Sequence, residues 1–182
     1  EKHKEITDSI NYAERIQRSF LATKDLLDQN LNDYFVFFQP KDVVSGDFYW
    51  ASRTQNNLLT LVVADSTGHG VPGAIMSILN ISSLEKSIDR MLNQPAEIFN
   101  HTRQIIVDRL KNDGSENGGH DGMDASIICI DKLNHLMHYA AANNPIWLIR
   151  NEELQELAYD KMPIGKHDLA SVSFKENILK IE

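Results

Sequence analysis

The chain has 182 residues, of which 42% are apolar, and its formal net charge is −8 at pH 7. This composition is typical of a globular protein and excludes a collagen-like or intrinsically disordered chain. The acidic balance argues against non-specific binding to nucleic acid or anionic membranes, because both need a basic surface, and we expect no nucleic-acid partner.

Residues 5–28 are predicted to form one amphipathic helix. Apolar side chains recur at spacings of three and four residues, at Ile6, Ile10, Ala13, Ile16, Phe20 and Leu27. The stripe is as narrow as a coiled-coil seam but covers only about three heptads. The periodicity is compatible with a helix packed on its own domain and with a connector or dimerisation helix. We therefore treat 1–30 as an N-terminal connector or dimerisation segment and 31–182 as one globular domain.

Strand-like segments surround two helices in the rest of the chain. Strands are predicted at 34–38, 47–51 and 58–64, with a turn at Asn56–Asn57. Helices follow at 74–88, with Pro72 in the first turn, and from Pro95 to about residue 111. After a glycine-rich loop at 112–122, strands are predicted at 126–130, 136–141, 146–150, 154–157, 171–174 and 178–181, with tight turns at 131–134 and 151–153. This order predicts an α+β fold with antiparallel sheets.

Two acidic motifs precede the helix predicted at 74–88. Asp65 ends an apolar strand and is followed by a glycine-rich turn and a helix start, where backbone N–H groups favour anionic ligands. An Asp in this place can also be a plain helix cap. Asp47 opens a strand that could pair with the strand ending at Asp65, which would bring both carboxylates to one edge of the sheet. Two such oxygen ligands suit Mg²⁺ or Mn²⁺.

Other polar residues carry weaker signals. His69 lies in the motif of Asp65 and could be a general acid, a metal ligand or a loop residue. The remaining histidines show no zinc-ligand spacing. Cys129 is the single cysteine, so an internal disulfide is impossible, and its apolar segment indicates a buried structural thiol.

Features of the whole chain bear on its location. A chain without disulfides fits a reducing compartment, and we expect a cytoplasmic protein. No apolar run approaches the roughly 18 residues of a membrane span, and no apolar core follows the polar N-terminus as in a signal peptide. The absence of an initial Met and the end in mid-pattern suggest a fragment of a longer protein, with the C-terminal part of the domain missing. The sequence leaves open whether that parent is tethered to a membrane.

Five motifs together resemble a known family. They are VSGDFYW at 44–50, VVADSTGHGVPGAIMS at 62–77, DGMDASIICID at 121–131, YAAANNPIWLIR at 139–150 and KMPIG at 161–165. In this order they resemble the SpoIIE-type branch of the metal-dependent protein serine/threonine phosphatases (the PPM superfamily), which includes RsbU-like regulators. The resemblance runs from about Phe38 to the C-terminus. It implies an α-β-β-α sandwich of two antiparallel sheets flanked by helices.

The same resemblance implies an activity and its residues. Two Mn²⁺ or Mg²⁺ ions would activate a water that hydrolyses phosphoserine or phosphothreonine in a protein. Asp47 and Asp65 match metal ligands, and Ser66 is a candidate ligand through its backbone carbonyl. His69 is a candidate catalytic acid, and Lys41 a candidate phosphate-binding residue. In the DGMD motif, Asp121 and Asp124 are not ligands in the family pattern, and Asp124 is expected to begin a core strand.

One departure from the family pattern leaves two hypotheses. The family takes further metal ligands from a Ser/Thr-Asp-Gly motif and from an Asp near the C-terminus, and no such motif follows residue 131. We therefore expect about half of the metal cage and weak ion binding. One hypothesis is a phosphatase for a phosphorylated regulatory protein of the partner-switching, anti-anti-sigma kind, linked by 1–30 to an upstream sensor domain and able to form homodimers. The alternative is a catalytically incomplete module that dimerises or binds a phosphoprotein.

Overall fold

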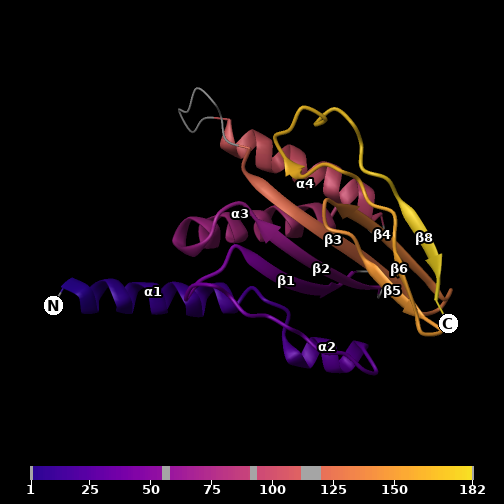
Figure 1. The fold of residues 1–182 in the computed structure, drawn as a ribbon, viewed down its shortest axis with the longest axis horizontal. Coiled ribbons are helices and arrows are strands. Elements are labelled where there is room, and N and C mark those ends of the chain that lie inside the picture. The colour runs from indigo at the N-terminus through magenta and orange to yellow at the C-terminus, as the bar shows by residue number, and fades with distance from the viewer. Residues whose placement is uncertain (1, 55–57, 91–93, 112–119, 182) are drawn as a thin grey trace.

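The computed structural model describes residues 2–54, 58–90, 94–111 and 120–181. Most strands form one six-stranded antiparallel sheet (Figure 1). In spatial order its strands are β1 (Asp47–Arg53), β2 (Leu59–Ser66), β3 (Gly122–Asp131), β4 (Leu136–Ala142) and β8 (Asn177–Lys180), with β7 (Ile164–Gly165) paired to the start of β3. A second, two-stranded antiparallel sheet contains β5 (Trp147–Arg150) and β6 (Glu153–Glu156). The predicted α+β class with two antiparallel sheets is confirmed.

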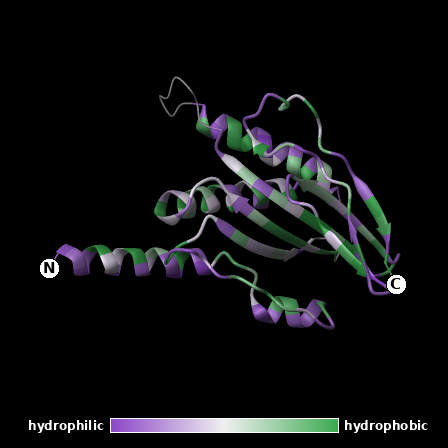
Figure 2. Ribbon diagram, in the orientation of Figure 1, coloured by the Kyte–Doolittle hydropathy of each residue, from purple (hydrophilic) through white to green (hydrophobic). Residues whose placement is uncertain are grey.

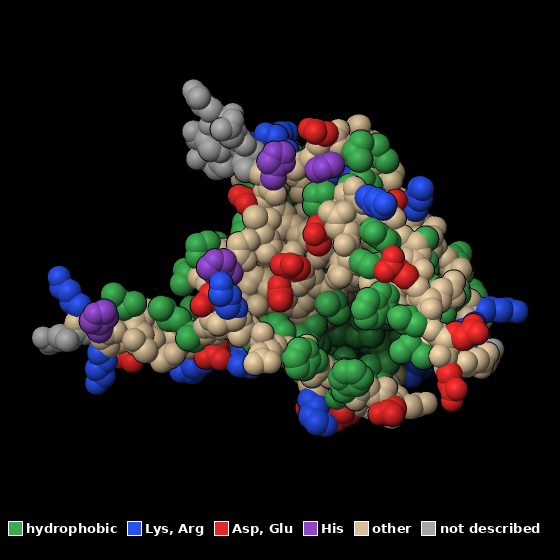
Figure 3. Space-filling model, in the orientation of Figure 1, with side chains coloured by type: hydrophobic (Ala, Val, Ile, Leu, Met, Phe, Trp, Pro, Cys, Tyr) green, Lys and Arg blue, Asp and Glu red, His purple; other side chains and the backbone are tan. Residues whose placement is uncertain are grey.

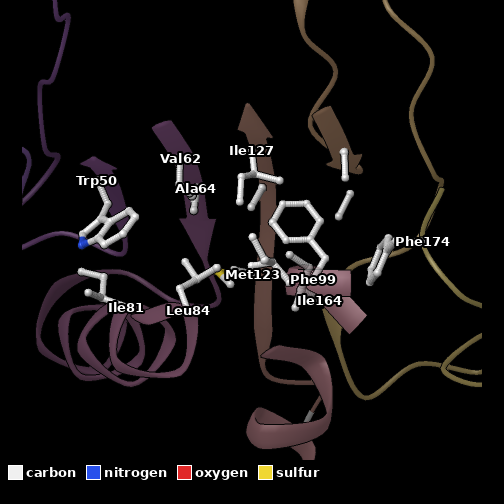
Figure 4. Packing of buried hydrophobic residues seen from close by; sticks show 14 of the residues in the cluster. Trp50, Val62, Ala64, Ile81, Leu84, Phe99, Met123, Ile127, Ile164 and Phe174 are labelled. Atoms are coloured by element: carbon white, nitrogen blue, oxygen red, sulfur yellow. The ribbon is translucent and has the colours of Figure 1, made fainter. Parts of the chain in front are cut away.

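The main core lies between the large sheet and two helices. Helix α3 (Gly70–Ile88) packs on β1 and β2, and α4 (Pro95–Leu110) packs on β3 and β4. Alternate strand residues point toward these helices, as the two-residue period of a strand requires. Figure 4 shows this contact, with Trp50, Val62 and Ile127 from the strands facing Ile81 and Leu84 of α3 and Phe99 of α4.

The opposite face of the large sheet contacts the small sheet. Met137 and Tyr139 of β4 are buried there against Leu157, which follows β6, and against the half-buried Leu148 of β5. Their neighbours in the sequence, such as Ala140, face the helix side instead. Figure 2 shows hydrophobic residues both in the strands and in the helices that cover them, and an alternation of hydrophilic and hydrophobic residues along the first helix.

The N-terminal segment is two helices, so the prediction of one continuous helix over 5–28 was wrong. Helix α1 (Lys2–Arg18) projects away from the sheets, and α2 (Lys24–Asn30) starts at the capping residue Thr23 (Figure 1). The break has a tertiary cause. Leu21 is buried in the core, and the backbone N–H of Ala22 donates to the carbonyl of Tyr49 in β1.

Two predicted strands are absent from the described residues. Residues 34–38 and 171–174 take no strand conformation, although both have strand-like composition. A strand needs a partner for its backbone groups, and neither segment pairs with a described strand. Phe35 is 90% exposed and Phe37 is 83% exposed. The short strand β7 was not predicted.

The remaining elements follow the prediction closely. Pro72 lies in the first turn of α3 and Pro95 opens α4. Cys129 is free and fully buried, as predicted. The predicted turn at Asn56–Asn57 and most of the 112–122 loop lie outside the described residues. Within the described part of the chain, no helix combines the length and apolar character that a membrane span requires.

Candidate active site

Asp47 and Asp65 lie directly opposite each other in the antiparallel register of β1 and β2. Burial raises the pKa of Asp65, and the hydrogen bond and negative charge of Asp47 raise it further. Two adjacent carboxylates resist simultaneous ionisation unless a shared proton or a cation compensates their charge. The two strands therefore form the paired-carboxylate edge that the motif spacing predicted.

Asp124 is a third carboxylate in the same row. The strand begins at Gly122, two residues before the expected start at Asp124, and the β2–β3 register places Asp124 opposite Asp65. Burial raises the pKa of Asp124, a hydrogen bond of 3.1 Å from Asn143 Nδ2 lowers it, and the charge of Asp65 raises it. Asp124 was not among the site residues expected from the sequence. The sequence did contain a signal for this carboxylate. Asp124 lies near the start of β3, which runs antiparallel to β2, the strand that ends beside Asp65.

The turn between Asp65 and α3 is shaped by close backbone contacts. A Cβ atom at Gly46 would lie 2.5 Å from the carbonyl oxygen of Gly68, and one at Gly73 would lie equally close, at 2.5 Å. Gly68 itself has φ of +89°, in the left-handed region that favours glycine. The glycines of the VSGD and GHGVPG motifs thus let the turn fold tightly between the start of β1 and the start of α3.

The Ser66 side chain points into the protein. Its hydroxyl accepts a hydrogen bond of 2.9 Å from Asn80 Nδ2 of α3, and Ser66 is only 2% exposed. Its backbone N–H donates to the carbonyl of Gly46. The Ser66 hydroxyl is therefore engaged internally, which leaves the backbone carbonyl as the group with which this residue could bind an ion.

Lys41 and His69 line the same small cleft as the carboxylate pair. This cleft has a volume of about 140 Å³, and its lining includes Lys41, Asp42, Asp47, Asp65 and His69. The Nδ1 atom of His69 lies 3.2 Å from Oδ2 of Asp42, and both side chains are exposed. The structure thus brings all the sequence-predicted site residues into one region, with Ser66 beneath the turn.

Two larger hollows border the carboxylates. A cleft of about 550 Å³ contains Asp65 and Asp124 together with His69, His120 and His167. On the other side, an apolar groove of about 480 Å³ runs from Asp47 and Asp65 along residues 34–38, of which Phe35 and Phe37 are exposed aromatic residues. Figure 3 shows acidic side chains clustered beside this hydrophobic hollow. The carboxylates therefore stand between a polar cleft and an apolar groove.

Comparisons with known proteins agree with this geometry. The family model of Stage II sporulation protein E (SpoIIE) matches residues 55–180. The SiaA-PP2C domain of Pseudomonas aeruginosa is 30% identical, with a TM-score of 0.85, and the match covers 100% of this chain and 69% of that chain. No curated protein sequence matches the chain.

More distant structures share the fold. The PP2C phosphatase domain with a regulatory-domain fragment of the cell fate determinant SpoIIE from Bacillus subtilis is 15% identical, with a TM-score of 0.61, over 76% of this chain and 39% of that chain. The catalytic domain of the serine threonine protein phosphatase PstP, in complex with two manganese ions, is 13% identical, with a TM-score of 0.52, over 80% and 69% of the two chains. With a family model matched over most of its length, the chain belongs to the SpoIIE family and is a protein phosphatase domain of the PPM type.

Proposed function

We propose that this domain hydrolyses phosphoserine or phosphothreonine on a regulatory protein, with Mn²⁺ or Mg²⁺ held at Asp47 and Asp65. The observation that carries the proposal is the register of β1 and β2, which sets the two carboxylates opposite each other. The PstP structure, which shares the fold, holds two manganese ions. The family membership supports the same chemistry.

The residues fit a hard divalent cation. Carboxylate and carbonyl oxygens are the ligands that Mg²⁺ and Mn²⁺ prefer. Burial and the adjacent Asp47 both raise the pKa of Asp65, and a bound cation would compensate the negative charge of the pair. Among the described residues, no group of three or more His, Cys, Asp or Glu side chains could hold a metal ion. Two carboxylates, the Ser66 carbonyl, water and substrate phosphate would then have to share the coordination, as Mg²⁺ commonly accepts.

Different residues of the chain would bind the ions, protonate the leaving group and bind the phosphate. When bound, the ions supply an activated water and neutralise phosphate charge. Asp47 and Asp65 would hold the ions at the sheet edge, with the Ser66 backbone carbonyl as a further ligand. His69, which contacts Asp42, would give a proton to the leaving serine or threonine oxygen. Lys41 offers positive charge to the phosphate from the same cleft.

Exposed apolar side chains on helix α1 support a link to another chain or domain. Ile6 is 58% exposed and Tyr12 is 61% exposed on this projecting helix. The B. subtilis relative was solved with a fragment of a regulatory domain. We propose that 1–30 connects the phosphatase to an upstream sensor domain and that α1 pairs with a second copy. The substrate would be a phosphorylated regulatory protein of the partner-switching kind.

Mn²⁺-dependent hydrolysis of a phosphoprotein or an aryl phosphate tests the proposal. Asp65→Asn and Asp47→Asn should each abolish the activity, whereas Asp108→Asn, an exposed carboxylate on α4, should not. The assay should use this chain and the full natural protein side by side. Phosphoprotein binding without hydrolysis in both would favour the alternative, a non-catalytic interaction module, which the small number of side-chain ligands would explain.

A further inference from the structure

A hydrogen-bond junction centred on the backbone of Gly122 borders the candidate site, with Asn80 and Gly122 buried and Thr67 exposed. The Gly122 carbonyl accepts from the Thr67 N–H at 3.0 Å, from the Thr67 hydroxyl at 3.3 Å and from Asn80 Nδ2 at 3.1 Å. The Gly122 N–H donates in return to Thr67 Oγ1 at 3.0 Å. Gly122, at the start of β3, is thus hydrogen-bonded both to the turn after Asp65 and to a side chain of α3.

Asn80 is the member that joins three elements. Its side chain is fully buried in α3, and the same Nδ2 also donates to the Ser66 hydroxyl at 2.9 Å. The Gly122 carbonyl can only accept, so the atom that faces it must be the amide nitrogen. No donor among the described residues reaches Asn80 Oδ1. All the protein hydrogen bonds of this amide therefore run to the end of β2 and the start of β3.

These contacts act on the residues that would hold the ions. Ser66 directly follows Asp65, and Gly122 precedes Asp124 by two positions. We propose that Asn80, with Thr67, is a positioning residue that sets the Ser66 backbone against the start of β3 and so fixes the ion-binding edge. The inference rests on the proposed function, which it deepens by naming residues that act through the ligands.

A purely stabilising role explains this residue less well. The buried oxygen of this amide has no protein donor, and its desolvation offsets part of the stabilisation that the amide's hydrogen bonds provide. An apolar side chain would avoid that penalty. Removal of the amide should therefore loosen the turn, while its effect on stability should resemble that of losing another buried polar group of α3. Partners that orient metal ligands typically change metal affinity when they are removed, even though they do not touch the metal.

The test uses four variants of the full chain. Asn80→Ala removes the amide, and Thr67→Val removes the hydroxyl, whereas Thr67→Ser keeps it. Ser83→Ala is the matched control, because Ser83 is also a fully buried polar residue of α3 but bonds to Leu79 and Arg109, away from the turn. The measurements are the Mn²⁺ dissociation constant by calorimetry, the metal-free unfolding midpoint, and hydrogen–deuterium exchange at the Thr67 and Gly122 amides.

The expected result separates positioning from stability. Asn80→Ala and Thr67→Val should weaken Mn²⁺ binding about tenfold or more and speed exchange at the two amides, whereas Ser83→Ala and Thr67→Ser should not. The unfolding midpoint of Asn80→Ala should match that of Ser83→Ala. Unchanged Mn²⁺ binding in a folded Asn80→Ala protein, or an equal loss in Ser83→Ala, would overturn the proposal. If wild type binds no Mn²⁺, the proposed function fails, and unchanged amide exchange in Asn80→Ala would separately refute the junction's role.

Discussion

The side chain of Gln17 forms a paired hydrogen bond with the backbone of Ser45. Its Oε1 accepts from the Ser45 N–H at 2.9 Å, while its Nε2 donates to the Ser45 carbonyl and to the Ser77 hydroxyl of α3. Gln17 is the one buried residue of α1 among those the structure describes. Because Ser45 lies two positions before Asp47, this contact connects the N-terminal helix directly to the candidate ion-binding edge.

Replacing Gln17 should therefore affect both stability and activity. Gln17→Ala leaves the Ser45 N–H and carbonyl without these partners, which should lower the free energy of unfolding by about 1–3 kcal/mol. We also expect a lower phosphatase activity at temperatures where the variant is folded. Chemical denaturation and a Mn²⁺-dependent assay measure the two effects. Arg18→Ala, on the neighbouring exposed position, is the control, and equal activity of both variants would refute the connection.

Asp65→Asn should separate stability from function. The raised pKa of Asp65 means that its charged form is disfavoured in the folded protein, so this charge costs stability at neutral pH. Without metal, the variant should unfold at a slightly higher temperature. The gain in unfolding free energy should be less than about 1 kcal/mol, because the site is solvent-accessible. The variant should also lose Mn²⁺ binding.

The pH dependence gives a second readout of the same variant. As pH falls through the raised pKa of Asp65, the wild-type carboxyl gains a proton and the stability advantage of Asp65→Asn should disappear. Thermal unfolding over a range of acidic pH values measures this. An advantage that grows toward low pH would contradict the assigned repulsion between Asp47 and Asp65.

Gly46→Ala tests the tight turn. The new methyl group would meet the Gly68 carbonyl at 2.5 Å, a backbone atom that cannot rotate away. We expect a loss of about 1–3 kcal/mol in unfolding free energy and weaker Mn²⁺ binding, since the start of β1 must shift. Ser52→Ala, on the strand β1 that follows Gly46, serves as the reference. Full stability and Mn²⁺ affinity in Gly46→Ala would show that the turn has more freedom than this contact allows.

Cys129 should be unreactive in the folded protein. It is fully buried, and burial raises the pKa of its thiol to about 11, so it carries almost no thiolate at neutral pH. A disulfide reagent should label it at a negligible rate in buffer and stoichiometrically in denaturant. Rapid labelling of the native protein would indicate that β3 opens readily.

The apolar stripe of α1, which includes Ile10 and Ile16, should determine the oligomeric state. Ile10→Asp combined with Ile16→Asp places charges on that stripe without touching the domain core. If α1 pairs with a second copy, light scattering should show the mass fall to that of a monomer, while the unfolding midpoint of the domain changes little. The control is the double substitution Glu5→Gln with Glu14→Gln, because these two residues of α1 lie outside the apolar stripe. An unchanged mass in the Asp variant would rule out pairing through this face.

The sequence by itself predicted what depends on neighbours along the chain. The hairpin of β1 and β2, the two helices and the common sheet edge of Asp47 and Asp65 follow from short-range signals: alternating apolar residues, a turn between strands, and proline at helix starts. From the sequence we expected only that both carboxylates would lie at one sheet edge if these strands paired, and the observed register sets them directly opposite each other.

Tertiary contacts decided the rest. The periodicity of 5–28 runs on without a break, but the burial of Leu21 and the bond from Ala22 to Tyr49 end α1 early. Residues 34–38 have the composition of a strand, yet pairing needs a partner that local composition cannot supply. Asp124, Asn80 and Gln17 join the site through bonds or register with residues far along the chain. Such long-range contacts depend on how the layers pack, and for that reason no spacing in the sequence revealed them.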